Sequence, residues 1–192
     1  MDARNAPRLT YKVALPGGQQ RLREAALYVM KKCEESTFFG LTKLNKILWK
    51  ADFSAYASRR VPVTGRQYQR LQQGPAPVEM LPVLQDLLRD GHIHIENRQQ
   101  GALSEKRPIS LVDPFLRYFS ADDLAYLDAA IDYYRSHSGR GVSKDSHGIA
   151  WKTRDNGAPM AYDLALLSDD KMTEDDKQRF LSLGEERLWQ SA

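Results

Sequence analysis

Four residues in the segment 41–58 combine polar and aromatic side chains that could bind a ligand. Asn45, Trp49, Asp52 and Tyr56 follow one another in steps that place them on one side of a helix. Together they could line a pocket with an amide, a carboxylate and two aromatic rings. Aromatic residues at helical spacing more often face a core. We therefore expect Trp49 and Tyr56 to pack inside and Asp52 to bond a nearby backbone or basic group, with the pocket as the alternative.

Histidine and cysteine residues raise the question of a metal site or a nucleophile. His92 and His94 are two positions apart, and imidazole suits zinc or nickel. No third ligand has a recognisable metal-site spacing, so we expect exposed strand histidines and no metal. Cys33 falls on the apolar side of a predicted helix, where a thiol acts as a small hydrophobic group.

The segment around Ser146 and His147 could suggest acid–base chemistry with Asp145 or Asp155. No glycine-rich turn places a nucleophile or an oxyanion site beside it. Gly139-Arg-Gly141 lacks the strand-to-helix context of a phosphate loop. We therefore predict no catalytic residue and no cofactor, and we interpret the chain as a protein that is not an enzyme.

Composition restricts the environment of the chain. Its 192 residues fit one domain, and 42% hydrophobic residues suffice for a core. The net charge of +3 comes from interspersed acidic and basic residues, too weak a bias to indicate nucleic-acid binding. The single Cys33 excludes an internal disulfide and favours a reducing cytosol. Neither a signal peptide nor an apolar run of membrane-spanning length, about 20 residues, is recognisable, so we expect a cytoplasmic protein.

The elements that must position these residues follow from the apolar pattern. It predicts helices at about 20–35, 41–58, 78–89 and 120–137, a short helix at 143–151 and a last helix at 173–189. Gly91 is placed to end the third helix, and segments 92–95 and 108–112 to form strands around a polar turn. Segment 10–15 could be a short strand, and 67–71 is ambiguous between strand and helix. Segment 74–77 is expected as a rigid loop because its prolines lack amide donors.

The expected fold class is mainly α (α+β): a compact helical domain with a small β-hairpin after the third helix. In the second helix we expect Lys43, Lys46 and Lys50 on a solvated side. In the third we expect Leu81, Leu84 and Leu88 on the buried side. We expect the chain to divide into an N-terminal extension (1–19), a main domain (20–167) and a C-terminal helical tail (168–192).

The third helix and the hairpin also have the outline of a winged helix. Arg98, Lys106 and Arg107 would lie on a wing that touches phosphate. The helix itself carries Glu79 and Asp86 and a single basic residue, whereas a major-groove helix presents Arg, Lys, Asn or Gln. We interpret the unit as a packing unit first, and keep a winged-helix-like DNA-binding regulator as the alternative function.

Motifs spread along the chain resemble those of the Panacea (SocA-like) antitoxin domain family. The helix motif runs from Leu41 through Lys43, Leu44, Lys46 and Trp49 to Asp52. It is followed by Val63-Thr-Gly65, an aromatic at Tyr68 and Gly74-Pro75. Gly91-His-Ile93 and then Ser143, Ser146, His147 and Trp151 complete the order. Gln73 stands where the family often has an aromatic residue.

The resemblance implies an antitoxin that neutralises a cognate toxin protein by direct binding. It implies as partner the product of an adjacent gene, in a bacterial or phage-associated setting, with a protease as a secondary partner, and neither a membrane nor, as the main target, nucleic acid. The matched positions, expected either to form a shared pocket or to build the core, are Trp49, Asp52, Tyr56, Tyr68, Gly74, Pro75, His147 and Trp151. Asp52 and His147 are the candidates for a polar contact that ties the late segment to the second helix.

Overall fold

The structure is a computed structural model that describes residues 9–100, 103–135, 137, 141, 146, 149–152 and 154–166. It has the expected α+β class. The helices are α1 (Gln19–Lys32), α2 (Leu41–Arg59), α3 (Met80–Arg89), α4 (Ala121–Tyr134) and the short α6 (Ile149–Lys152), with a 3-10 turn η2 (Tyr162–Leu166). The strands are β1 (Tyr68–Leu71), β2 (Gly74–Pro77), β3 (Ile93–Gln100), β4 (Leu103–Ser110) and β5 (Pro159–Met160).

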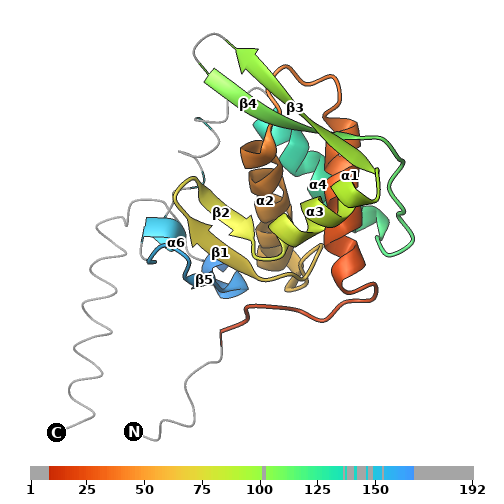
Figure 1. Cartoon of the computed structure of the whole chain (residues 1–192). Coiled ribbons are helices and arrows are strands. Elements are labelled where there is room, and N and C mark those ends of the chain that lie inside the picture. The colour runs from red at the N-terminus through yellow and green to blue at the C-terminus, as the bar shows by residue number, and fades with distance from the viewer. Residues whose placement is uncertain are drawn as a thin grey trace, which may run out of the picture.

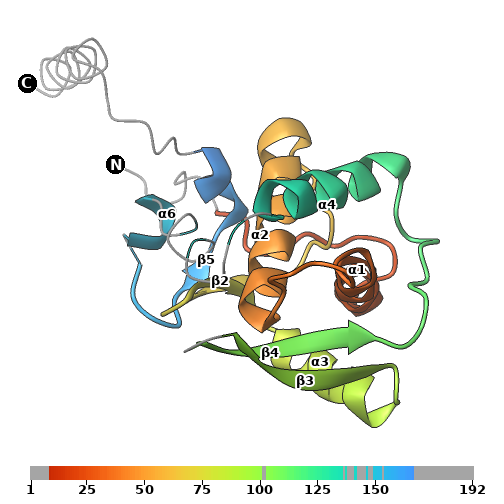
Figure 2. The same cartoon turned by 90° about the horizontal axis from the view of Figure 1, so that it is seen from above.

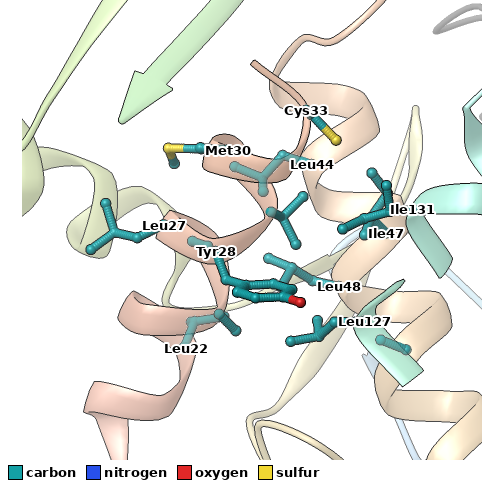
Figure 3. Packing of buried hydrophobic residues seen from close by; sticks show 14 of the residues in the cluster. Leu22, Leu27, Tyr28, Met30, Cys33, Leu44, Ile47, Leu48, Leu127 and Ile131 are labelled. Carbon is teal, nitrogen blue, oxygen red and sulfur yellow. The ribbon is translucent and has the colours of Figure 1, made fainter. Parts of the chain in front are cut away.

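Helix α2 is the centre of the molecule. Figures 1 and 2 show α1 and α4 against one side of it and the sheet of β1, β2 and β5 against another. Leu44, Ile47 and Leu48 of α2 are completely buried. They pack with apolar residues of α1 and α4, among them Leu22, Tyr28, Leu127 and Ile131 (Figure 3). This burial is the main force that holds the three helices together.

Helix α4 begins where its sequence provides a capping box. The Ser120 side chain accepts a hydrogen bond from the Asp123 amide, and the Asp123 side chain accepts one from the Ser120 amide. Asp123 also forms ion pairs with Arg21 of α1 and Arg59 of α2. One carboxylate therefore starts α4 and fixes it to both neighbouring helices.

The first sheet has the antiparallel order β2-β1-β5. Tyr68 pairs with Pro77 of β2 on one side and with Met160 of β5 on the other. Segment 74–77, expected as a loop, is therefore an edge strand, a position that tolerates proline because one row of its backbone groups faces away from the sheet. The ambiguous segment 67–71 becomes a strand through the same pairing.

The second sheet is the expected hairpin after α3. Strands β3 and β4 pair along eight positions each, from Ile93 opposite Ser110 to Gln100 opposite Leu103. The ladder is longer than the sequence pattern predicted. Gly91 ends α3 with a positive φ of 69°, and the His92 amide donates back to the Leu87 carbonyl. This is the C-terminal role predicted for Gly91.

Two further local expectations, for segment 10–15 and for the buried side of α3, are wrong. Residues 10–15 form no strand; the segment instead makes single backbone bonds, from the Val13 amide to Gly65 and from the Tyr162 amide to Thr10. In α3 the buried side is Met80, Val83, Leu84 and Leu87. Leu81 and Leu88 are 66% and 41% exposed, because the helix is rotated by about one residue from the expected face.

The described part of the chain contains no helix with the length and apolar character of a membrane span. The predicted last helix at 173–189, and most of the predicted helix at 143–151, lie outside the described residues.

Candidate functional site

Asp52 is the polar centre of the interface between α2 and the first sheet. It is completely buried, and its Oδ1 accepts a 2.6 Å hydrogen bond from the Thr64 amide. Its Oδ2 accepts bonds from the Thr64 hydroxyl and, at 3.0 Å, from the Tyr68 hydroxyl. The Tyr162 hydroxyl lies 3.2 Å from the same oxygen and is shared with the Arg66 carbonyl at 2.6 Å. We call Asp52, Thr64, Tyr68 and Tyr162 the Asp52 cluster.

The environment of this cluster determines its protonation. Burial raises the pKa of Asp52 to about 6, although hydrogen bonds from Thr64, Tyr68 and Tyr162 favour the carboxylate. Burial, together with the nearby Asp52 charge, raises the pKa of both Tyr68 and Tyr162 well above 10. The two phenols therefore remain protonated donors at neutral pH.

A second buried polar group lies on the same helix at Lys46. Its side chain is 2% exposed, and its Nζ donates a 2.7 Å hydrogen bond to the Pro75 carbonyl. Burial lowers the pKa of this amine to about 7. Gly74 has a positive φ of 99°, and a Cβ there would lie 2.4 Å from Ser146 Oγ and 2.9 Å from Lys46 Nζ. We call Lys46, Gly74, Pro75 and Ser146 the Lys46 cluster.

The Lys46 cluster joins three motifs that are far apart in the sequence: the α2 motif, the Gly-Pro pair and the late Ser-His segment. Only glycine at position 74 leaves room for this approach. Because Ser146 is 1% exposed and Lys46 nearly as buried, the cluster is closed to solvent. It connects segments of the chain rather than presenting groups to a substrate.

The predicted aromatic residues lie around these two clusters. Tyr56 and Tyr68 are buried in one apolar cluster with Phe53 and Tyr162, and Trp49 packs against it. The Tyr56 hydroxyl donates to Asp163 Oδ1 at 3.2 Å. Trp151 lies on α6, where its Nε1 donates to the Leu71 carbonyl at 2.8 Å. His147 lies outside the described residues, so its predicted contact with Asp52 stays a prediction. Within the described part of the chain, a residue later than this segment, Tyr162 of η2, contacts Asp52.

For two residues of these clusters, Tyr162 and Lys46, the sequence did not predict a buried polar contact. Tyr162 stands in a segment without a recognisable motif, and only the tertiary fold brings it to Asp52. Lys46 was expected on a solvated side, and this expectation is wrong for Lys43 as well, since both are 2% exposed. Among the described residues, Lys43 Nζ has no hydrogen-bond partner, and burial lowers the pKa of this amine. The lysine spacing alone gave no sign of this burial.

The cysteine and the histidines that the sequence raised as candidates lie in the core or beside charged side chains. Cys33 is buried in the main core, and burial raises its pKa. His94 is exposed on β3 beside Glu96, and His92 contacts Arg23. Among the described His, Cys, Asp and Glu residues, no group of three or more could hold a metal ion.

The hairpin differs at Arg107 from the wing that the sequence suggested. This residue is 1% exposed, and its guanidinium donates to the carbonyls of Cys33, Glu34 and Ser36. It fixes the α1–α2 connection to β4 and cannot also contact phosphate. Arg98 is exposed and donates to Glu96 at 2.7 Å.

A family model described as "Antitoxin SocA-like, Panacea domain" matches residues 44–152. The chain belongs to the SocA-like antitoxin (Panacea domain) family. No curated protein and no solved structure matches it. Membership in this family supports an antitoxin-type role, and a toxin is the general class of partner that such a role implies.

The Panacea family match includes all of one buried cluster and only part of the other. It contains every residue of the Lys46 cluster, and it contains Asp52, Thr64 and Tyr68. Tyr162 lies ten residues beyond its end at 152. The structure therefore extends the packing around the matched segment to a residue that the family match does not include.

Proposed function

We propose that this Panacea protein is an antitoxin that neutralises a cognate toxin by direct protein–protein binding, without performing chemistry on it. Family membership carries the proposal. The burial of the motif residues supports it, because Asp52 and Lys46 stabilise the fold and are closed to a substrate. Contact with a partner then belongs to the exposed surface.

The exposed side of α3 favours a protein partner over DNA. Leu81 and Leu88 are exposed there, and Arg89, the only basic residue of the helix, is paired with Asp86 at 2.8 Å. A recognition helix in the major groove would need polar or basic side chains at such positions. Exposed apolar side chains, in contrast, are common where proteins associate.

Co-expression with each neighbouring open reading frame tests the proposal. We expect that one neighbour arrests growth alone, is tolerated together with this chain, and co-purifies with it. A matched control carries a stop codon early in the antitoxin gene, so that the transcript is made without the protein. Rescue by this control, or the lack of any toxic and co-purifying neighbour, would contradict neutralisation by protein binding.

A further inference from the structure

A cationic surface lies where β1 meets the late part of the chain, and the clusters described above do not use it. The Arg70 guanidinium stacks on the Trp151 indole, with its central carbon 3.8 Å from the ring centroid. Trp151 is fixed in turn by its hydrogen bond to the Leu71 carbonyl. Figure 1 shows α6 beside the sheet that contains β1 and β5. We call Arg70, Trp151, Lys152 and Arg154 the Arg70 patch.

Among the described residues, the three cations of this patch have no carboxylate partner. None of Arg70, Lys152 and Arg154 forms an ion pair there, and exposed Asp155 pairs with none of them. Elsewhere, Arg21, Arg59 and Arg66 are each paired with a carboxylate. With three positive groups and one negative group, the surface keeps a local excess of positive charge.

The patch also contains donors without acceptors. The Nε atoms of Arg70 and Arg154 are shielded from solvent and have no hydrogen-bond partner among the residues that the structure describes. Within the same part of the chain, the Arg70 guanidinium makes a single hydrogen bond, from Nη1 to Asn156 Oδ1 at 3.2 Å. Shielded donors are almost always paired in native proteins, and leaving one unpaired is unfavourable. Within the described part of the chain, the patch therefore has more positive charges than negative charges and more donors than acceptors.

We propose that the Arg70 patch binds a carboxylate-rich segment of a partner protein. This inference rests on the proposed function in one respect, namely that the natural partner is the toxin. A guanidinium held flat on an indole is oriented before binding, and arginine is well suited to a carboxylate because it can donate two parallel hydrogen bonds. Lys152 and Arg154 add two more positive charges for further acidic residues of the same segment.

The same features favour an acidic peptide over nucleic acid. Arg70 covers one face of Trp151, and that face is then closed to base stacking. Three cations beside Asp155 could neutralise only a few phosphates, whereas the affinity of proteins for nucleic acid usually comes from a larger number of phosphate contacts. A short run of Asp or Glu residues matches the size and charge of the patch.

Fluorescence anisotropy of a fluorescein-labelled hexaglutamate peptide with the full-length chain tests the proposal. We expect low-salt binding that weakens with added NaCl and falls at least about tenfold, or 1.4 kcal/mol, in K152A/R154A and in R70A. The matched control R89A/R98A also removes two charges, but from arginines that are already paired, and should bind as wild type. Equal thermal unfolding midpoints would show that the variants are folded, and K152A/R154A leaves the Arg70–Trp151 stack in place.

Three results would overturn the proposal. The first is equal peptide binding by wild type and K152A/R154A. The second is a labelled single-stranded oligonucleotide that binds more tightly than hexaglutamate through the same cations. The third is peptide binding only after Asp169, Asp170, Asp175 and Asp176 are changed to Asn, which would make the chain's own acidic segment the occupant. Because no toxin is present, the peptide assay can fail while the co-expression test succeeds, and the reverse.

Discussion

Asp52 acts at the level of a single residue by accepting hydrogen bonds from several buried donors. The Thr64 amide and the Tyr68 hydroxyl both end on its oxygens inside the protein. Removing the carboxylate leaves these donors without an acceptor and opens a cavity. Each effect alone is destabilising.

We expect Asp52→Ala to lower the free energy of unfolding by about 3 kcal/mol or more. Urea denaturation followed by circular dichroism measures the change. Asp132→Ala is the matched control, because Asp132 is 67% exposed and pairs only with Arg135; it should change stability by about 0.5 kcal/mol or less. Similar stabilities for the two variants would show that Asp52 does not hold the fold together.

Lys46 makes stability depend on pH in the neutral range. Its pKa falls from 10.5 to about 7 on folding, so the folded chain binds fewer protons than the unfolded chain between these values. The stabilisation by the neutral amine is complete above 10.5 and is lost as pH falls towards 7. The free energy of unfolding should therefore rise from pH 7 to 8.5.

The comparison with Lys46→Met isolates this effect. The wild-type curve should rise relative to the variant by at most about 1.4 kcal/mol per pH unit. Denaturant titrations at several pH values between 7 and 8.5 measure both curves. Parallel curves would mean that Lys46 stays charged in the folded protein.

The side of the helix on which a residue lies was easier to predict than whether that residue is buried. The spacing of Asn45, Trp49, Asp52 and Tyr56 placed them on one side of α2, and Asp52 indeed bonds a backbone amide. No local pattern distinguished Lys46 from the exposed lysine of an ordinary helix, because its burial depends on β2, which lies about 30 residues later.

At the level of elements, the close contact between α2 and β2 depends on Gly74. Any other residue at position 74 would have to adopt a positive φ of 99°. Its Cβ would also lie less than 3 Å from both Ser146 Oγ and Lys46 Cε. Gly91 offers a comparison, because its φ is also positive, at 69°, but a Cβ there meets nothing within 4 Å. The two glycines separate backbone strain from steric overlap.

We expect Gly91→Ala to destabilise the protein by about 1 kcal/mol, through backbone strain alone. Gly74→Ala should destabilise it by at least about 2 kcal/mol more, because overlap adds to strain. Thermal unfolding of both variants gives the difference. Equal losses would mean that the chain around Ser146 moves away without penalty.

Element positions were predictable where the pattern allowed one answer. The Gly91 terminator is local, and it is present in the structure. In α3, however, two sets of residues have helical spacing: 80, 83, 84 and 87, and 81, 84 and 88. Only packing against α1 and β3 decides between them. The same holds for segment 74–77, which becomes a strand only because β1 lies beside it.

At the level of the whole molecule, the first described residues connect distant parts of the fold. The Thr10 amide donates to Asp163 Oδ2 at 2.6 Å, and the Thr10 carbonyl accepts from the Tyr162 amide at 2.7 Å. The Val13 amide bonds the Gly65 carbonyl. The segment thus connects η2 to the turn that supplies Thr64 to Asp52.

Deleting residues 1–15 should therefore increase hydrogen exchange at the amides of 162–166 and lower the unfolding temperature by several degrees. Deleting residues 1–8, which removes none of these bonds, is the control. Mass spectrometry of exchange in both truncated chains measures the effect. Unchanged protection of 162–166 would show that the segment contributes little to the fold.

The distance in sequence between Asp52 and Tyr162 also concerns synthesis. At about 5–20 residues per second, a ribosome needs on the order of ten seconds to extend the chain from one residue to the other. During that interval Thr64 and Tyr68 can already reach Asp52, whereas the donor from position 162 does not yet exist. The nascent chain therefore completes its central interface only after residue 162 has been translated. An interrupted translation product would keep the helices but lack the residue that closes the Asp52 cluster.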